Sequence, residues 1–415
     1  MNNLNKYLFI ICLSLFAVKA FAQNPTRDLD YYLNQARASS PLLKDQQNQQ
    51  RSSGIDSLII KATAKPQLTA NGAGLYAPII RGYGYDEVIT NGHSLEGYLK
   101  LDYDLLNKKR ISNQLEGVKI QRDSILYASM ISLYDLNRSI VDQYLLAYGS
   151  QEQRDFNREV VFLLEKEEVL LKQLTRSNIY KQSEYLTFLV TLQQQQLAAK
   201  QSELQLQNDY ATLAFISGVI DTTSMLLTQP KIDNSGIHTD RNFFLQKFSI
   251  DSLKNENIRQ EINLSYKPKL GIYANGGYSS SLILQPYKNF GASVGFTFSV
   301  PIYDGQQRKM QYDKLAISSN TISAYKNFFV SQQAQQLILI RQQIAQTDVL
   351  FVKINEQIKF SKALIDVDSK LLHTGDLRIA DFVIAINNYM AAQNLFRQTT
   401  INRLKLINQY NYWNK

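Results

Sequence analysis

The positions of the prolines constrain this chain more than any other feature. Residues 79–229 and 302–415 contain no proline, because all eight prolines lie at positions 25, 41, 66, 78, 230, 268, 286 and 301. A proline inside a helix costs about 3 kcal/mol. The two proline-free stretches can therefore form helices of unusual length.

Two segments inside those stretches, 108–175 and 305–372, carry apolar residues at steps of three and four. Such a pattern, sustained over many heptads, indicates a coiled-coil-like helix. At 1.5 Å per residue each helix would be roughly 100 Å long, far longer than a globular domain needs. A fibrous coiled coil would show the same pattern, so the rest of the chain must decide between them.

Each long helix is followed by a break and a second helical segment. Asn178 interrupts the first helical pattern and Gly375 interrupts the second. Asparagine and glycine tolerate the left-handed backbone that ends many helices. We therefore predict returning helices over 179–217 and 376–412, which gives two antiparallel helix pairs.

Two segments ahead of the long helices alternate apolar and polar residues with period two. In 93–104 leucines alternate with charged residues and tyrosine, and in 290–300 phenylalanine and valine alternate with glycine, serine and threonine. This length and alternation fit the strands of a membrane barrel, although a half-buried strand in a soluble sheet would look similar. The expected partner strands are 66–76 and 268–279, with connecting loops at 77–92 and 280–289.

The same order of elements occurs twice: helix, Lys-Pro, strand, loop, strand, long helix, break, returning helix. Asn178 corresponds to Gly375, and Glu184 to Asp381, at the same offset along the chain. The pattern predicts an internal duplication in a mainly helical protein with strands. The expected divisions are a signal peptide at 1–22, a first helix–hairpin–helix repeat at 23–217, a linker at 218–240 and a second repeat at 241–415.

The N-terminus has the pattern of a secretory signal peptide. Residues 7–18 are almost wholly apolar, and small residues precede an expected cleavage between Ala22 and Gln23. A run of about a dozen apolar residues is too short for the roughly 20 that span a bilayer. The only cysteine, Cys12, lies in this segment, so disulfides, thiolate metal sites and a cysteine nucleophile are not expected in the mature chain.

Nothing in the sequence indicates catalysis. The formal net charge of +9 comes from lysines and arginines scattered among acidic residues, and with export predicted we expect no nucleic-acid partner. His93, His238 and His373 have no second ligand at metal-binding spacing, and no glycine-rich phosphate loop occurs. We therefore expect no catalytic residue, no metal and no cofactor, and we expect His373 to cap a helix.

Two strands per repeat give only four per chain, too few to close a membrane barrel. An open sheet edge in lipid leaves backbone groups without hydrogen bonds, which is prohibitively costly. If these strands enter a membrane, several protomers must close one barrel together.

With this order of elements, the sequence resembles the TolC-like family of outer-membrane efflux channels. The resemblance rests on the strand-to-helix passage FTFSVPIYDGQQRKM at 296–310, the bend LLHTGDLRIADFVIAINNYMAAQNLF at 371–396, and SSPLL at 39–43. It implies a homotrimer with a shared β-barrel in the outer-membrane lipid and a hollow α-barrel in the periplasm. It also implies a passive exit duct for small molecules or proteins. Such a duct serves a tripartite efflux or type I secretion system, with a periplasmic adaptor and an inner-membrane transporter.

The resemblance further implies a periplasmic gate near the second bend, with acidic residues facing the pore. Asp381 stands at the position of the first acid, and Ile384 stands where a second acid can occur. Leu377 takes the family's basic position, next to Arg378, and Glu184 is the matching acid of the first repeat. Three Asp381 carboxylates in a trimer would repel one another and favour cations.

Asp366 and Asp368, just before the second bend, are expected on the outer surface of the tip. Two other classes of protein stay open: a periplasmic adaptor and a coiled-coil structural protein of a transport complex. An adaptor would carry one helical hairpin beside compact β domains, and a coiled-coil protein would not need the alternating strands. The duplicated strand pairs therefore favour the channel.

Overall fold

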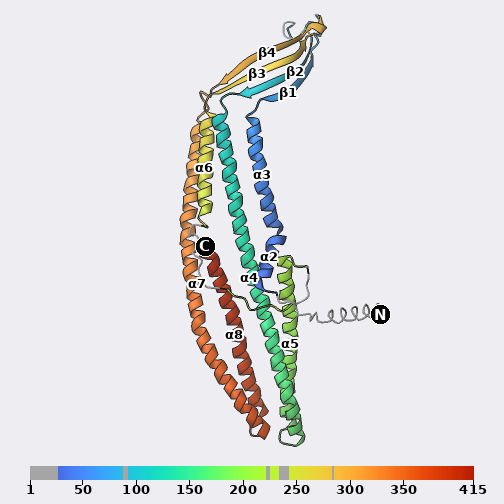
Figure 1. The fold of residues 1–415 in the computed structure, drawn as a ribbon, viewed down its shortest axis with the longest axis vertical. Helices are drawn as coiled ribbons and strands as arrows, with labels where there is room; N and C mark the ends of the chain where they lie inside the picture. Colours follow the sequence, from blue (N-terminus) through green and yellow to red (C-terminus); the bar gives the residue numbers. More distant parts are fainter. Residues whose placement is uncertain (1–26, 87–91, 221–224, 233–242, 283–284) are drawn as a thin grey trace, which may run out of the picture. The chain divides into compact units, whose positions relative to one another are not determined.

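A computed structural model describes residues 27–86, 92–220, 225–232, 243–282 and 285–415 (Figure 1). The expected signal peptide and its cleavage site lie outside the described residues. The elements follow in the order α2 (Leu29–Ser39), α3 (Pro41–Thr63), β1 (Gln67–Tyr76), β2 (His93–Asp104), α4 (Lys108–Arg176), α5 (Gln182–Ser217), α6 (Gln246–Ser265), β3 (Lys269–Ser280), η1 (Pro286–Lys288), β4 (Phe290–Ser299), α7 (Gln307–Thr374) and α8 (Ile379–Trp413).

The two long helices begin and end within two residues of their predicted positions. α4 has 69 residues and α7 has 68. Asn178 and Gly375, which follow them, have left-handed backbone with φ of 59° and 83°. The returning helices α5 and α8 start three residues later than predicted. Lys181 and Arg378 have extended backbone there and form the N-caps of α5 and α8.

Contacts divide the chain into two compact units, which are described separately. The helical unit contains α2, α5, α8 and the C-terminal parts of α4 and α7, from Ile131 and Gln332 onwards. Near the bends its core includes Phe188 and Phe382, and a second buried cluster is rich in tyrosine. None of the helices in the described ranges is long and apolar enough to cross a membrane.

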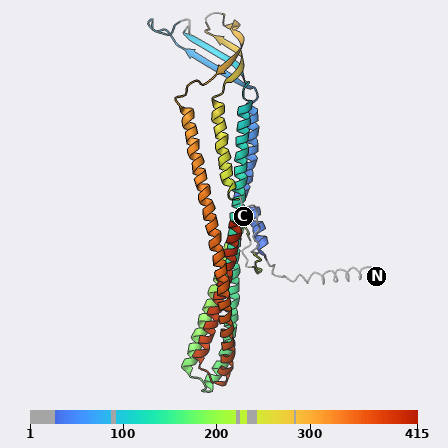
Figure 2. The same ribbon diagram turned by 90° about the vertical axis from the view of Figure 1, so that its left-hand side faces the viewer.

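The sheet unit contains the four strands, α3, α6 and the N-terminal parts of α4 and α7. The strands are antiparallel in the order β1-β2-β3-β4 (Figure 2), and each begins and ends within one residue of its predicted position. β2 pairs with β3, so one sheet joins strands from both predicted repeats. The duplication over 23–217 and 241–415 stays a prediction from the sequence, because each compact unit draws on both halves of the chain.

Part of the predicted polar linker is packed into the helical unit. Leu227 is buried in the same cluster as Tyr144. The Gln151 side chain donates to the Leu227 carbonyl at 3.0 Å and accepts from the Leu227 N–H at 2.9 Å, and the Tyr144 hydroxyl donates to the Thr228 carbonyl at 2.7 Å. The composition of 218–240 did not indicate this packing, because the contacts come from the backbone and from a few scattered apolar side chains, Val219, Met225 and Leu227.

Candidate functional site

The sheet has one apolar face and one polar face. Residues paired directly across neighbouring strands share a face, and successive residues alternate between faces. One row across the four strands consists of Leu68, Leu101, Ala274 and Val294, and the next row consists of Thr69, Lys100, Asn275 and Ser293. The predicted alternation therefore extends across the whole sheet.

The apolar face is uncovered in the single chain. Val294 is 84% exposed and Phe296 is 74% exposed, with Phe290 and Phe298 similarly open. Burial of a side chain of this size is worth about 1.5–3 kcal/mol. Contiguous apolar surface of this kind marks a contact with another protein or with a membrane, so this face requires an apolar covering.

The polar face carries paired charges and a flat aromatic ring. Lys100 Nζ lies 2.9 Å from Asp102 Oδ1 and 5.8 Å from the centre of the Tyr273 ring. The Tyr273 ring covers Gly295, where any side chain would collide with it. Glycine at this position of β4 therefore lets the ring lie flat against the sheet.

Each outer strand of the sheet has one unpaired edge. In the part of the chain that the structure describes, β1 pairs only with β2, and β4 pairs only with β3. Unpaired N–H and C=O groups attract another strand, and in lipid each costs several kcal/mol. A single chain therefore supplies an incomplete sheet if that sheet enters a membrane.

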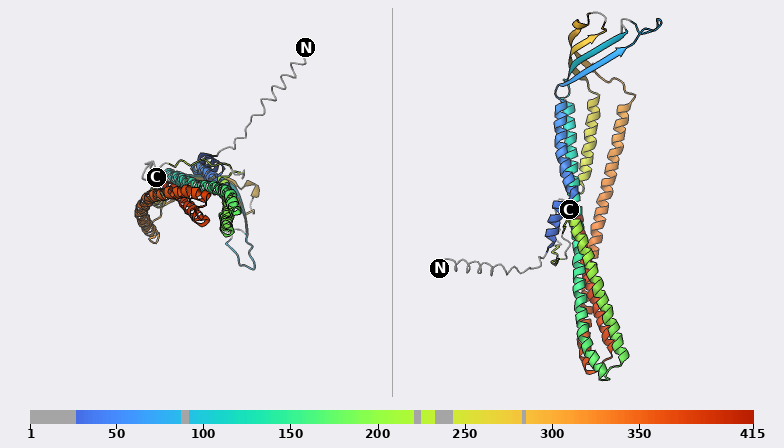
Figure 3. Two further views of the ribbon diagram at one scale, coloured as in Figure 1. Left: turned by 90° about the horizontal axis from the view of Figure 1, so that it is seen from below. Right: turned by 90° about the vertical axis from the view of Figure 1, so that its right-hand side faces the viewer.

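The two bends lie side by side in the helical unit (Figure 3). Tyr180, in the first bend, is 6% exposed, and its Oη lies 2.9 Å from the Leu372 carbonyl and 2.8 Å from the Leu377 carbonyl in the second bend. Burial raises the pKa of the Tyr180 hydroxyl, which keeps its proton for donation. Ile179 packs so close to Gly375 that a side chain there would collide with it. Hydrogen bonds and close packing therefore hold the first bend against the second.

We expect Tyr180→Phe to destabilise the contact between the bends by about 1–3 kcal/mol, because it removes the hydroxyl donor from the Leu377 carbonyl. The Leu372 carbonyl keeps the Gly375 N–H as its donor. Hydrogen exchange of the amides at 372–378 should become faster. Tyr185→Phe is the matched control, because the Tyr185 hydroxyl bonds Glu168 within the first helix pair. Equal acceleration in both variants would contradict the assignment.

Glu184 and Asp381 occupy the same place in the first turns of α5 and α8 but have different partners. Glu184 Oε2 accepts a hydrogen bond from the Lys181 backbone N–H at 3.3 Å. Asp381 accepts two from the Arg378 guanidinium, from Nε at 2.9 Å and from Nη2 at 3.0 Å. This pairing raises the pKa of Arg378. This ion pair was not predicted from the sequence.

Ile384 lies one helical turn after Asp381 on α8 and is 56% exposed. Residues three apart on a helix share a face, so an apolar and a charged side chain are presented together. A pore-facing position for Ile384, Asp381 and Glu184 stays a prediction.

Asp368 does not lie on the outer surface, contrary to the sequence-based expectation. It is 6% exposed, and Leu372, one turn further along α7, is buried on the same side. Burial, and then the charge of Asp381, raises the pKa of the Asp368 carboxyl. Asp366 is exposed in the single chain, and its place on the outer surface of the tip stays a prediction.

Asp368→Asn should raise the melting temperature at neutral pH. Because the pKa of Asp368 is higher in the folded state than in the unfolded state, its carboxyl group contributes to the free energy of unfolding when it is protonated, at pH below the unfolded pKa. That contribution is lost as pH rises through the folded pKa. Asparagine removes that loss, so the gain should be largest at pH 7 to 8 and shrink towards about pH 4, near the ordinary pKa of aspartate. The exposed control Asp366→Asn should show no gain. A gain of equal size at every pH would refute this explanation.

His373 was expected to cap a helix, but its side chain contacts an acidic residue of another helix. Its Nε2 lies 3.2 Å from Oε2 of Glu167 on α4, and Glu167 is buried. This contact is one of several links between the two helix pairs. Across the described ranges, no group of three or more His, Cys, Asp and Glu side chains is arranged to hold a metal ion.

Neither a protein-family model nor a curated protein matches the sequence, but solved structures match the fold over most of the chain. The channel protein CusC matches with a TM-score of 0.75 at 11% identity, covering 93% of this chain and 91% of that one. The outer-membrane protein VceC of Vibrio cholerae matches at 0.71 with 12% identity and coverages of 93% and 95%. The open-state MtrE outer-membrane channel of Neisseria gonorrhoeae matches at 0.73 with 12% identity and coverages of 93% and 88%. The chain therefore has the fold of TolC-like outer-membrane channels.

Proposed function

We propose that this chain is one protomer of an outer-membrane channel and not an enzyme. The observation that carries the proposal is the four-stranded sheet with one apolar face, one polar face and two unpaired edges. An apolar outside and a polar inside are what a barrel in a bilayer needs. The fold shared with CusC, VceC and MtrE supports the same function.

The protomers would form a homotrimer in which β1 of one copy pairs with β4 of the next. Exposed apolar stripes on the helices support this arrangement. On α5 the stripe consists of Leu186, Val190, Leu197 and Leu204, and on α7 it consists of Val349, Val352, Phe360, Leu364 and Val367. If the α5 stripe of one copy packs against the α7 stripe of the next copy, every contact joins two different surfaces. Such contacts close into a ring when a whole number of copies completes a full rotation.

The transport function would be passive. The long helices would continue the duct into the periplasm, towards a periplasmic adaptor and an inner-membrane transporter that supplies the energy. The cargo class is small molecules or proteins, as in tripartite efflux or type I secretion. Within this duct, Asp381, Ile384 and Glu184 would form the gate at the periplasmic mouth, with Arg378 offsetting the charge of Asp381.

Membrane fractionation with chemical crosslinking tests the proposal. We expect the mature protein in the outer-membrane fraction, soluble only with detergent, with crosslinked products that stop at three chains. Crosslinkers placed at 175–185 and 370–382 should also capture an adaptor. A mature protein that stays monomeric and soluble without detergent would rule the channel out.

A further inference from the structure

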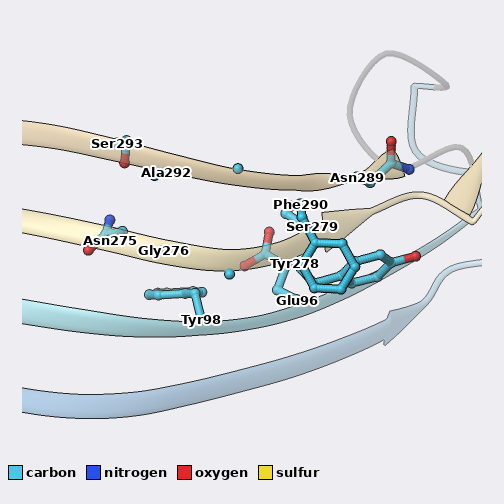
Figure 4. Close-up of a pocket in the computed structure, with 12 residues that line it drawn as sticks. Glu96, Tyr98, Asn275, Gly276, Tyr278, Ser279, Asn289, Phe290, Ala292 and Ser293 are labelled. Carbon is cyan, nitrogen blue, oxygen red and sulfur yellow. The ribbon is translucent and has the colours of Figure 1, made fainter. Parts of the chain in front are cut away.

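A pocket opens on the polar face of the sheet, across β2, β3 and β4 (Figure 4). It has a volume of about 470 Å³. The register explains the hollow, because a row that contains Gly277 and Gly291 lies between two rows that carry side chains. An added Cβ at Gly291 would meet nothing within 4 Å. The floor of the pocket is therefore bare strand backbone at Gly291, whereas Gly277 lies close against Tyr98.

Polar side chains and one aromatic ring surround this floor. Glu96 and Ser279 are directly paired on the side towards the strand-connecting loops, and Asn275 and Ser293 are paired on the other side. Tyr98 lies in the glycine row, next to Gly277. All of these residues line the pocket.

The charge of the pocket is negative. Among the strand residues that the structure describes, the polar face carries the acids Glu96, Asp102 and Asp104. Asp102 pairs with Lys100, and Asp104 pairs with Arg110. No ion pair is found for Glu96 in the described ranges. The pocket thus carries the Glu96 carboxylate, while Lys100, which pairs with Asn275 across the strands, already has Asp102 as its ion-pair partner.

The geometry points to a binding site for an organic ammonium ion on the polar face of the sheet, with Glu96 as its charge partner. A carboxylate and two hydroxyl groups accept hydrogen bonds from an ammonium group, and the Tyr98 ring face attracts a cation. The pocket is too roomy for a bare metal ion and large enough for an aromatic body. The inference deepens the proposed function, because in a channel this face lines the lumen and the ligand would be cargo in transit.

Binding of benzylammonium to the purified full chain in detergent tests the site, with its uncharged counterpart benzyl alcohol as the control ligand. Glu96→Gln keeps the shape and removes the charge, and it should weaken benzylammonium binding by about tenfold, the loss of one charge-assisted hydrogen bond. Gly291→Val should weaken it at least as much by filling the pocket. Gly97→Val is the matched control, because Gly97 is equally open but belongs to the opposite face.

The expected result is a clear order: the native chain and Gly97→Val bind benzylammonium, and both pocket variants bind it weakly. Equal binding to the native chain and Glu96→Gln, or binding of benzyl alcohol as tight as that of benzylammonium, would overturn the site. Loss in Glu96→Gln with full binding in Gly291→Val would also overturn it, because the charge would then act outside the pocket. Saturation-transfer NMR measures ligand binding without requiring ion conduction. The proposed binding site and the proposed channel function are therefore tested independently.

Discussion

Val294→Lys should prevent the chain from assembling in the outer membrane. Val294 is in the middle of β4 on the exposed apolar face. A lysine on the lipid face of a barrel costs about 2–4 kcal/mol near the bilayer midplane, and a trimer incurs that cost three times. The amount of crosslinked trimer in outer-membrane fractions, and folding yield in lipid vesicles, should both fall severely.

The neighbouring residue provides the control for this prediction. Ser293 is adjacent to Val294 but points to the polar face, in the row with Lys100 and Asn275. Ser293→Lys should therefore assemble much better than Val294→Lys, although the two changes add the same charge one residue apart. If Ser293→Lys proved as harmful, or if both variants assembled normally, the apolar face would not be the lipid face.

The helices and strands could be predicted because each has a simple period in the sequence. Alternation at period two identified β2 and β4, and the absence of proline identified α4 and α7. The bends followed from residue types that tolerate left-handed backbone. These signals are local, so the sequence alone places such elements well.

Contacts between distant segments could not be predicted in the same way. Tyr180 has no local feature that distinguishes it from the other 24 of the 25 tyrosines, and only the folded bends bring its hydroxyl to the Leu372 and Leu377 carbonyls. Asp368 looked like a surface acid because its burial depends on the packing of neighbouring helices. The three-residue spacing between Arg378 and Asp381 permits an ion pair on a helix, but the family resemblance assigns the basic position to Leu377.

The pair at the second bend gives the sharpest test of the gate. Arg378 and Asp381 offset each other's charge, so a pore ring of three such pairs would be nearly neutral. Arg378→Ala should leave three unpaired carboxylates, which make the channel more cation-selective and tighten block by divalent cations. Asp381→Asn should leave three unpaired guanidinium groups and move both properties the other way. A change of about tenfold in the blocking constant for either variant corresponds to roughly 1.4 kcal/mol.

Opposite shifts of the reversal potential in a salt gradient are the result that requires Asp381 in the pore. The double variant should return close to the native selectivity, because it removes one positive and one negative charge per protomer. Lys370→Ala is the control for overall charge, since Lys370 is an exposed lysine near the end of α7 and is not one of the proposed gate residues. If Lys370→Ala shifts the potential as far as Arg378→Ala does, net charge at the tip and not the Asp381 ring sets selectivity. If neither Arg378→Ala nor Asp381→Asn changes conductance, block or selectivity, Asp381 does not face the pore.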